Sequence, residues 1–160
     1  TLPSVSMESL VVLSGTMLAA LGVAAGIPKK TIERAARIAC DTASIHAMHD
    51  PTEGGVATAL REMAQAANVG LSINVEALFA TEDTQQLCQI FNFDPLGIIS
   101  SGALLIGVAE LDANAVCTAI REANIRCDII GRAEDPSFGI KLSDTNLPHF
   151  DRDEIGKVFE

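Results

Sequence analysis

Apolar positions dominate the amino-terminal part of the chain. The run from Ser6 to Ala25 predicts one buried helix, interrupted in character near Ser14-Gly15. Its most apolar part, Leu10 to Gly26, is shorter than the ~20 residues that a membrane-spanning helix needs. No basic residue precedes it, as one would in a secretory signal peptide. We therefore expect this helix to pack inside a folded domain.

The next segments alternate between helical and extended periodicity. Pro28 suits the first position of a helix, and apolar residues then recur at helical spacing up to Cys40-Asp41. Short strands are predicted over 44–49 and over 69–75, where apolar and polar residues alternate. Between these strands, a polar loop from Asp50 to Gly55 leads into a helix over 56–67.

The second half of the chain continues this alternation. Thr81 fits an N-cap, and the acidic Glu82 and Asp83 follow it, so a helix is predicted that ends before Asp94-Pro95. A loop over 97–101 leads into a strand over 102–109. Asp112 is then predicted to cap a helix with Val116, Ile120 and Ala123 on its core face.

The C-terminal pattern completes the expected architecture. Residues 127–131 and 138–142 predict strands separated by a turn. Asp151 and Glu154 match a capping pattern for a short last helix with Ile155, Val158 and Phe159 inside. Helices and strands that alternate in this way predict an α/β fold, a mixed β-sheet packed with helices, in a single domain over residues 1–160.

Composition and charge narrow the possible partners. The net charge is −10 and the pI is about 4.6, and the largest basic cluster is Lys29-Lys30. Nucleic acids and anionic membranes are bound through clustered Lys and Arg, so we expect neither as a partner. The chain has four cysteines, Cys40, Cys88, Cys117 and Cys127, and none of them form a C-x-x-C pair. We therefore predict that they are small buried side chains in a reducing, cytoplasmic compartment.

The loop from Asp50 to Gly55 is the segment most suggestive of chemistry. Backbone N–H groups at a helix start carry partial positive charge, and glycines let a phosphate approach them closely. Asp50 ends the strand, where its carboxylate is placed to bind Mg²⁺ together with phosphates. An ordinary turn explains the same residues, because Asp-Pro starts turns and Thr52 can cap a helix. The spacing alone leaves both interpretations open.

Other polar residues give weaker signals. His46 and His49 are three positions apart on a predicted strand, which places them on opposite faces and disfavours a shared metal. Ser101 and Gly102 precede a buried strand, where they can bind an oxyanion or simply form a solvated turn. A hydrolase that uses His49 and Asp50 has little support, because no nucleophile is evident.

Several segments together resemble the AIR synthase-related superfamily. The sequence from Met48 to Leu60 resembles the Asp-Pro-Thr-x-Gly-Gly segment of the hydrogenase maturation dehydratases in this group. Three further segments fit in order and rough spacing: Asp94-Pro95-Leu96, Ser101 to Leu105, and Leu147 to Ile155. The resemblance covers roughly residues 30 to 160, and the succession of motifs makes it more specific than any single one.

The resemblance implies the C-terminal domain of a two-domain, dimeric enzyme that uses ATP and Mg²⁺ on a small-molecule substrate. By this resemblance, Asp50 is a metal ligand, and Thr52, Gly54 and Gly55 lie near nucleotide phosphates or substrate. Ser101 and Gly102 are further binding candidates. The usual N-terminal domain, which supplies most metal ligands and much of the ATP site, has no counterpart in this sequence. The chain begins at Thr1, so we expect a piece of a longer protein that is inactive alone.

Two departures from the family pattern affect the expected reaction. Glu53 stands where the hydrogenase maturation dehydratases usually have Arg. The chain ends Lys157-Val158-Phe159-Glu160, without the C-terminal Cys that those enzymes modify, so synthesis of the hydrogenase cyanide ligand is not expected. The alternative function is a non-catalytic module that binds a ligand or a protein.

Overall fold

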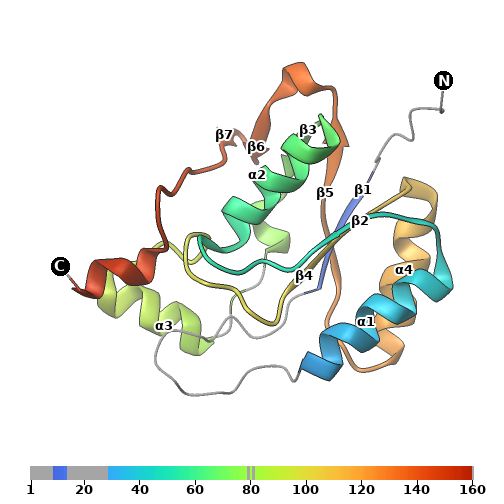
Figure 1. Ribbon diagram of the computed structural model, residues 1–160, viewed down its shortest axis with the longest axis horizontal. Helices are drawn as coiled ribbons and strands as arrows, with labels where there is room; N and C mark the ends of the chain where they lie inside the picture. Colours follow the sequence, from blue (N-terminus) through green and yellow to red (C-terminus); the bar gives the residue numbers. More distant parts are fainter. Residues whose placement is uncertain (1–8, 14–28, 79, 81, 160) are drawn as a thin grey trace.

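A mixed β-sheet forms the centre of the computed structural model, which describes residues 9–13, 29–78, 80 and 82–159 (Figure 1). The described strands form a seven-stranded sheet with the order β2-β4-β1-β5-β3-β6-β7. Neighbouring strands are antiparallel except β3 and β6, which are parallel. The predicted mixed sheet is therefore confirmed. The strands are Ser9–Leu13 (β1), Ile45–His49 (β2), Gly70–Ile73 (β3), Leu104–Val108 (β4), Asp128–Glu134 (β5), Ile140–Leu142 (β6) and Thr145–Asn146 (β7).

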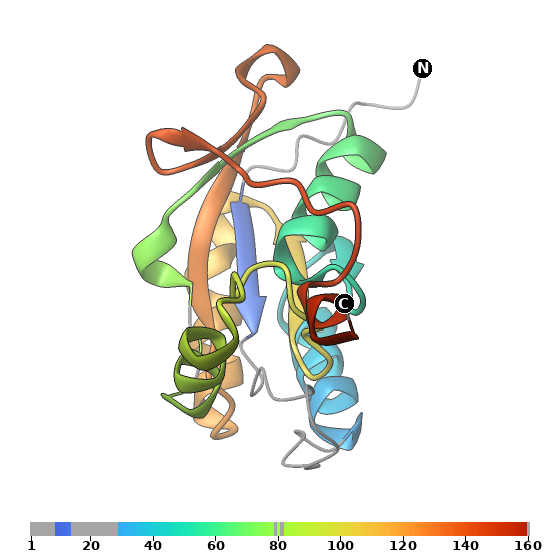
Figure 2. The same ribbon diagram turned by 90° about the vertical axis from the view of Figure 1, so that its left-hand side faces the viewer.

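The helices cover both faces of this sheet. They are Lys29–Thr42 (α1), Gly55–Ala67 (α2), Glu82–Phe91 (α3) and Glu110–Glu122 (α4), with 3₁₀ turns at Val75–Ala77, Pro136–Phe138 and Glu154–Phe159. The helices α1 and α4 lie together on one face, whereas α2 packs on the other (Figures 1 and 2). The last 3₁₀ turn contacts the region of α3. Within the described residues, no helix has the length and apolarity to cross a bilayer.

Strand β4 connects the two apolar cores. Leu104, Ile106 and Val108 pack with α1 and α4, whereas Leu105 between them packs with α2. All five residues of the strand are buried. A strand with a core on each face needs apolar residues at every position, which explains the continuous apolar run in the sequence.

The helix predicted from Ser6 to Ala25 is wrong where the structure describes it. Residues Ser9–Leu13 form strand β1, which is hydrogen-bonded to β4 on one side and to β5 on the other. The stretch Leu10-Val11-Val12-Leu13 is uniformly apolar, so its periodicity does not distinguish helix from strand. A central strand with two β-branched residues satisfies the same pattern. The rest of the predicted helix lies outside the described residues.

Two predicted helix starts are also wrong in detail. Helix α4 starts at Glu110 with Ala109 at its N-cap, and Asp112 lies inside the first turn. The Asp112 carboxylate still lies where the helix dipole favours an acid. In the last turn, the cap is Asp153 rather than Asp151, because Asp153 Oδ1 accepts the Ile155 N–H at 3.0 Å.

The last turn also exposes two side chains that were predicted to lie inside. Val158 is 48% exposed and Phe159 is 84% exposed. This turn is a 3₁₀ helix, whose three residues per turn shift side chains away from the positions that α-helical spacing predicts. Thr81, the predicted cap of α3, lies outside the described residues, whereas the predicted helix itself is confirmed.

The prediction of buried cysteines holds for three of the four. Cys88, Cys117 and Cys127 are buried, but Cys40 is exposed. On α1 the buried residues are Ala35 and Ala39. Each helical residue is rotated by about 100° from the one before it, so Cys40 turns away from the core that Ala39 contacts.

Candidate functional site

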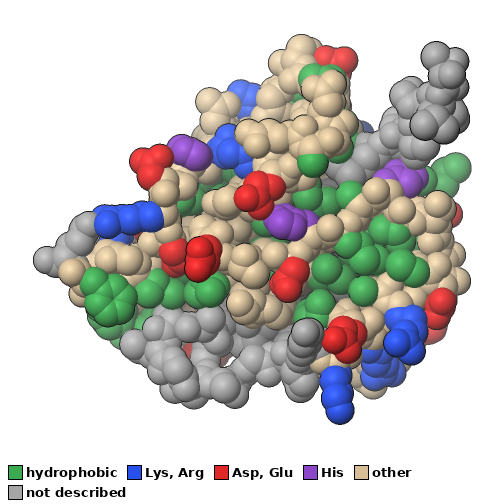
Figure 3. All heavy atoms as spheres, viewed as in Figure 1, with side chains coloured by type: hydrophobic (Ala, Val, Ile, Leu, Met, Phe, Trp, Pro, Cys, Tyr) green, Lys and Arg blue, Asp and Glu red, His purple; other side chains and the backbone are tan. Residues whose placement is uncertain are grey.

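The loop from Asp50 to Gly55 connects the edge strand β2 to α2, as the sequence predicted. Asp50, Thr52 and Glu53 are exposed, whereas Pro51 and the two glycines are buried. The side chains of Asp50, Thr52 and Glu53 are therefore accessible to solvent in the loop between β2 and α2. The face that carries α2 and the C-terminal segment has several acidic side chains at its centre (Figure 3).

The two glycines of this loop are required by its geometry. Gly54 and Gly55 have φ angles of +75° and +66°, a region that L-residues rarely adopt. A Cβ on Gly55 would lie 2.4 Å from the Leu96 carbonyl oxygen and 2.5 Å from that of Ile98. Gly55 thus lets this loop approach the backbone of the segment that precedes β4.

Backbone hydrogen bonds join the two predicted site segments. The Ser100 N–H donates to the Thr52 carbonyl at 3.3 Å, and the Ala57 N–H donates to the Leu96 carbonyl at 3.0 Å. Ser100 is fully buried, and its hydroxyl donates to the Ile98 carbonyl at 3.0 Å. The next residue, Ser101, is exposed. Thr52 and Ser101, which are far apart in sequence, therefore belong to adjoining loops.

The residue Gly102 completes the second loop. Its φ angle is +98°, and the Ala103 N–H donates back to the Ser100 carbonyl at 3.0 Å. This tight turn points the chain into β4. Gly102 thus shapes the loop beside Thr52, and Ser101 contributes the hydroxyl on its exposed side.

The C-terminal segment closes over these loops, which the sequence analysis missed. The Gly54 N–H donates to Asp153 Oδ2 at 2.9 Å, and the Glu154 N–H donates to the Gly97 carbonyl at 3.0 Å. A carboxylate therefore accepts a backbone N–H of the loop that was expected to face a phosphate. The sequence analysis assigned Asp151 and Glu154 to a capping pattern for the last helix and did not single out Asp153.

Glu154 is a buried carboxylate held by its neighbours. It is 6% exposed, and its Oε2 accepts the Asp94 N–H at 2.9 Å and Lys157 Nζ at 2.5 Å. Burial by itself would raise the pKa of Glu154. The hydrogen bonds from Lys157 and Asp94, with the positive charges of Lys157 and Arg152, outweigh that effect and hold the pKa below the ordinary glutamate value.

We expect Glu154→Gln to lower the free energy of unfolding by about 1–2 kcal/mol at pH 7, because it removes a charged acceptor from a buried N–H. The folded-state pKa is the lower one, so this stabilisation is complete above the unfolded pKa of about 4.3 and is lost as the pH falls through the folded pKa. Urea unfolding from pH 7 to pH 3 measures the difference from wild type, which should shrink in acid. Asp151→Asn, whose side chain is 96% exposed, is the control. Equal stability of Glu154→Gln and wild type at pH 7 would contradict this account.

Both histidines of β2 line one hollow between β2 and α2. Its volume is about 360 Å³, and Glu62 and Met63 also line it. A register shift between Ile45 and Ala47 interrupts the regular alternation of β2, so the predicted separation of His46 and His49 onto opposite faces does not hold at this hollow. His49 Nε2 lies 2.7 Å from Glu62 Oε2. His46 Nδ1 is buried without a hydrogen-bond partner among the described residues.

The carboxylate of Asp50 fits the requirements of Mg²⁺ as one ligand of several. No group of three or more His, Cys, Asp or Glu in the described part of the chain is arranged to hold a metal ion. Mg²⁺ in phosphate-processing sites is bound by one or two carboxylates, with phosphate oxygens and water as the other ligands. An exposed Asp50 at the start of the Asp50–Gly55 loop can supply one carboxylate of that donor set.

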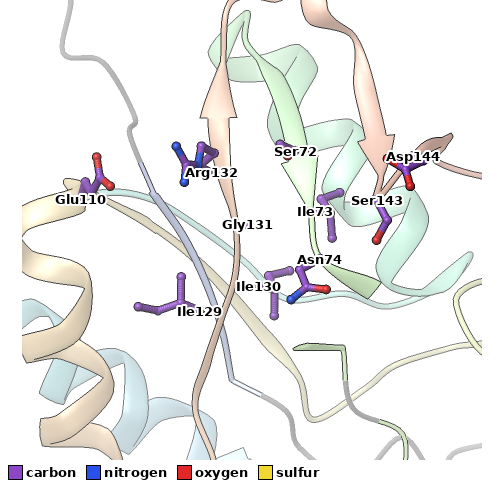
Figure 4. Close-up of a pocket in the computed structure, with 10 residues that line it drawn as sticks. All are labelled: Ser72, Ile73, Asn74, Glu110, Ile129, Ile130, Gly131, Arg132, Ser143 and Asp144. Carbon is purple, nitrogen blue, oxygen red and sulfur yellow. The ribbon is translucent and has the colours of Figure 1, made fainter. Parts of the chain in front are cut away.

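A second hollow of about 500 Å³ lies beside β3 and β5 (Figure 4). Its polar side chains have mixed charge: Glu110, Arg132 and Asp144, with Ser72, Asn74 and Ser143. Arg132 and Ser72 are register partners on β5 and β3. None of the predicted site residues lines this hollow. It is therefore separate from the Asp50–Gly55 loop, which we call the glycine loop.

These features define an α/β domain in which the glycine loop meets the loop that contains Ser101 and Gly102, beside a mixed sheet. A family model described as AIR synthase related protein, C-terminal domain, matches residues 11–142, and the chain belongs to this family. The resemblance predicted from the motifs is therefore confirmed.

Known relatives are longer than this chain. A putative hydrogenase expression/formation protein of Methanocaldococcus jannaschii is 36% identical over 98 residues, which cover 60% of this chain and 29% of the relative. The structure of E. coli HypE, a hydrogenase maturation protein, is 22% identical, with a TM-score of 0.75 over 94% of this chain and 53% of HypE. A HypE structure in complex with ATP is 18% identical, with a TM-score of 0.71 and the same coverage. The matched part of the chain thus covers about half of HypE and less than a third of the curated relative.

Proposed function

We propose that this chain is the C-terminal domain of an ATP-dependent enzyme that activates a substrate oxygen by phosphoryl transfer. The observation that carries the proposal is the junction of the Asp50–Gly55 loop with the loop that contains Ser101 and Gly102. Asp50 and Thr52 are exposed at this junction, and the glycines hold it tightly against the backbone before β4. Membership of the family and the ATP complex of HypE support ATP as the ligand.

In this proposal each residue has a definite role. Asp50 binds Mg²⁺, which would neutralise charge on the phosphates during transfer. Thr52 and Ser101 offer hydroxyl groups to phosphate or substrate. Gly54, Gly55 and Gly102 shape the loops, and positioning of the reactants supplies most of the catalysis.

The negative charge of Glu53 bears on the kind of phosphate that binds here. Glu53 is exposed in the same loop as Asp50, three positions away, so the loop carries two exposed carboxylates. A free phosphate would be repelled by both. A phosphate already bound to Mg²⁺ would be attracted, so we propose that the ligand enters as its magnesium complex.

The remainder of the enzyme is part of the proposal. We propose that an N-terminal domain supplies further metal ligands and much of the ATP site, and that the protein acts as a cytoplasmic homodimer on a small-molecule substrate. The extra length of the relatives supports a second domain. On this basis the isolated 160-residue chain lacks part of its active site.

One observation favours the alternative of a non-catalytic binding module. The Gly54 N–H donates to Asp153, so an internal carboxylate already occupies one donor of the loop. A loop that is satisfied internally can serve as a structural joint without binding ATP. The two functions differ in whether Mg²⁺ and nucleotide bind at Asp50.

Calorimetric titration with Mg²⁺ and a non-hydrolysable ATP analogue tests the proposal. We expect micromolar binding, about −8 kcal/mol, that weakens at least about tenfold in Asp50→Ala because the metal loses a ligand. Asp144→Ala is the matched control: it removes the same charge from an exposed turn next to β7, at the opposite edge of the sheet from β2. Equal weakening in both variants would reject Asp50 as the metal ligand. Absence of binding to this chain would require the same titration on the longer protein, and absence there would favour the module.

A further inference from the structure

The thiols of Cys117 and Cys127 meet in the core between α4 and the sheet. Their Sγ atoms are 3.1 Å apart, and the two residues are 2% and 0% exposed. Cys117 lies in α4, and Cys127 immediately precedes β5, ten residues later. Both are free thiols in the structure. This close pair has no role in the proposed phosphate site.

The turn that joins the two cysteines is held by Arg121. Its Nε donates to the Cys127 carbonyl at 2.7 Å, and its terminal nitrogen lies 3.1 Å from an oxygen of Asp128. Asn124, within the turn, has a φ angle of +58° that reverses the chain. The end of α4 and the start of β5 are thus fixed so that the sulfurs face each other.

We propose that Cys117 and Cys127 form a reversible disulfide that fastens the end of α4 to the start of β5. A disulfide has an S–S distance of about 2.05 Å, so the sulfurs need to approach by only about 1 Å. The site is a redox modification site that is independent of the proposed ATP-dependent activity.

The environment makes Cys117 the first nucleophile. The hydrogen bond between the two thiols lowers the pKa of Cys117, and Arg121 acts in the same direction against the opposing effect of burial. The same hydrogen bond raises the pKa of Cys127, and burial adds to that rise. Thiolates rather than thiols attack disulfides, so oxidation begins at Cys117.

A low-molecular-weight disulfide such as glutathione disulfide is the oxidant. The Cys117 thiolate attacks one glutathione sulfur, forms a mixed disulfide and releases a glutathione thiolate. Cys127 then loses its proton to solvent, and its thiolate attacks Cys117 Sγ and releases the second glutathione thiolate. Two protein thiols are oxidised, and one glutathione disulfide is reduced to two glutathione molecules.

Burial controls the rate and the effect of this reaction. The oxidant reaches Cys117 only when the end of α4 opens locally. Cys117 should therefore react more slowly than the exposed Cys40 with the same thiol reagent. The disulfide closes a short loop and restricts the unfolded chain, so it should raise the Tm. Because α4 packs on α1 and contacts β1 and β5, the oxidised pair would stabilise that half of the molecule.

The test uses Cys40→Ser, which removes the exposed thiol that could link two molecules. Three of the four thiols then remain. After equilibration of the folded protein with oxidised glutathione, and separately after refolding in it, thiols are counted in denaturant. We expect the count to fall from three to one, with a mass loss of two hydrogen atoms and a peptide that links Cys117 to Cys127. The Tm should rise by several degrees and return after reduction.

Two further variants in this background identify the pair. Cys127→Ser should stop the reaction at the mixed disulfide of Cys117 with glutathione, a loss of one thiol with one glutathione added to the mass. Cys88→Ala should retain the intramolecular disulfide, with a fall from two thiols to none. If Cys127→Ser does not fold, Cys88→Ala and the peptide map still decide the pairing. Retention of all three thiols under both conditions, or a disulfide that contains Cys88, would overturn the proposal.

Discussion

Replacing Gly55 by Ala is expected to lower the free energy of unfolding by about 4 kcal/mol, among the larger effects of a single substitution. The new Cβ would lie 2.4 Å and 2.5 Å from the carbonyl oxygens of Leu96 and Ile98. Both obstacles are backbone atoms, which cannot rotate away as a side chain does. The φ angle of +66° adds backbone strain of about 1–2 kcal/mol for any L-residue. Chemical denaturation with matched spectroscopic probes measures the loss.

Gly139→Ala is the matched control for this experiment. Gly139 has a similar φ angle of +72°, but a Cβ there meets nothing within 4 Å. Its ψ angle of −160° places it in a region that essentially only glycine adopts, so the variant should show backbone strain alone, about 1–3 kcal/mol. The difference between the two variants measures the close approach of the glycine loop to the segment before β4. Equal losses in the two variants would mean that this approach is not essential to the fold.

Local sequence signals were sufficient where an element and its boundaries are set by neighbouring residues. The strand–loop–helix unit was predicted as 44–49, Asp50–Gly55 and 56–67, and the structure has β2 at Ile45–His49 and α2 at Gly55–Ala67. The glycines mark the boundary because their positive φ angles cannot continue a helix or strand. Helical periodicity then predicts α2.

Distant contacts could not be predicted in the same way. The carboxylate of Asp153 caps Gly54 from 99 positions away, and Thr52 accepts a hydrogen bond from Ser100 in another loop. No local spacing encodes either contact, because both depend on the packing of the complete sheet. The helix predicted over the residues of β1 was wrong for a related reason. The apolar residues there suit either a buried helix or a central strand, and only the pairing with β4 and β5 decides between them.

These differences change how the candidate site is interpreted. The sequence suggested a helix start with unused N–H groups, whereas the structure gives the Gly54 N–H an internal carboxylate partner. Anion recognition through that donor would require Asp153 to move. The exposed Asp50 and Thr52 need no such change, and they are therefore the better residues for a first mutational test of ligand binding.

The position of the glycine loop also depends on how α2 packs, and Leu60→Ala should reveal it. Leu60 is fully buried in the core that α2 shares with Leu71, Leu105 and Ile130. Removing its terminal carbons leaves a cavity in a close-packed region, and we expect a loss of about 3 kcal/mol in the free energy of unfolding. Denaturant unfolding measures this loss.

Leu111→Ala provides the same chemical change without burial. Leu111 lies on helix α4 and is 93% exposed, so its truncation should change stability by less than about 0.5 kcal/mol. A small loss in Leu60→Ala would mean that α2 can shift to fill the cavity. Since α2 starts at Gly55, such a shift would also move the loop that contains Asp50 and Thr52. A loss near 3 kcal/mol would instead support a rigid helix that holds the candidate site in one position.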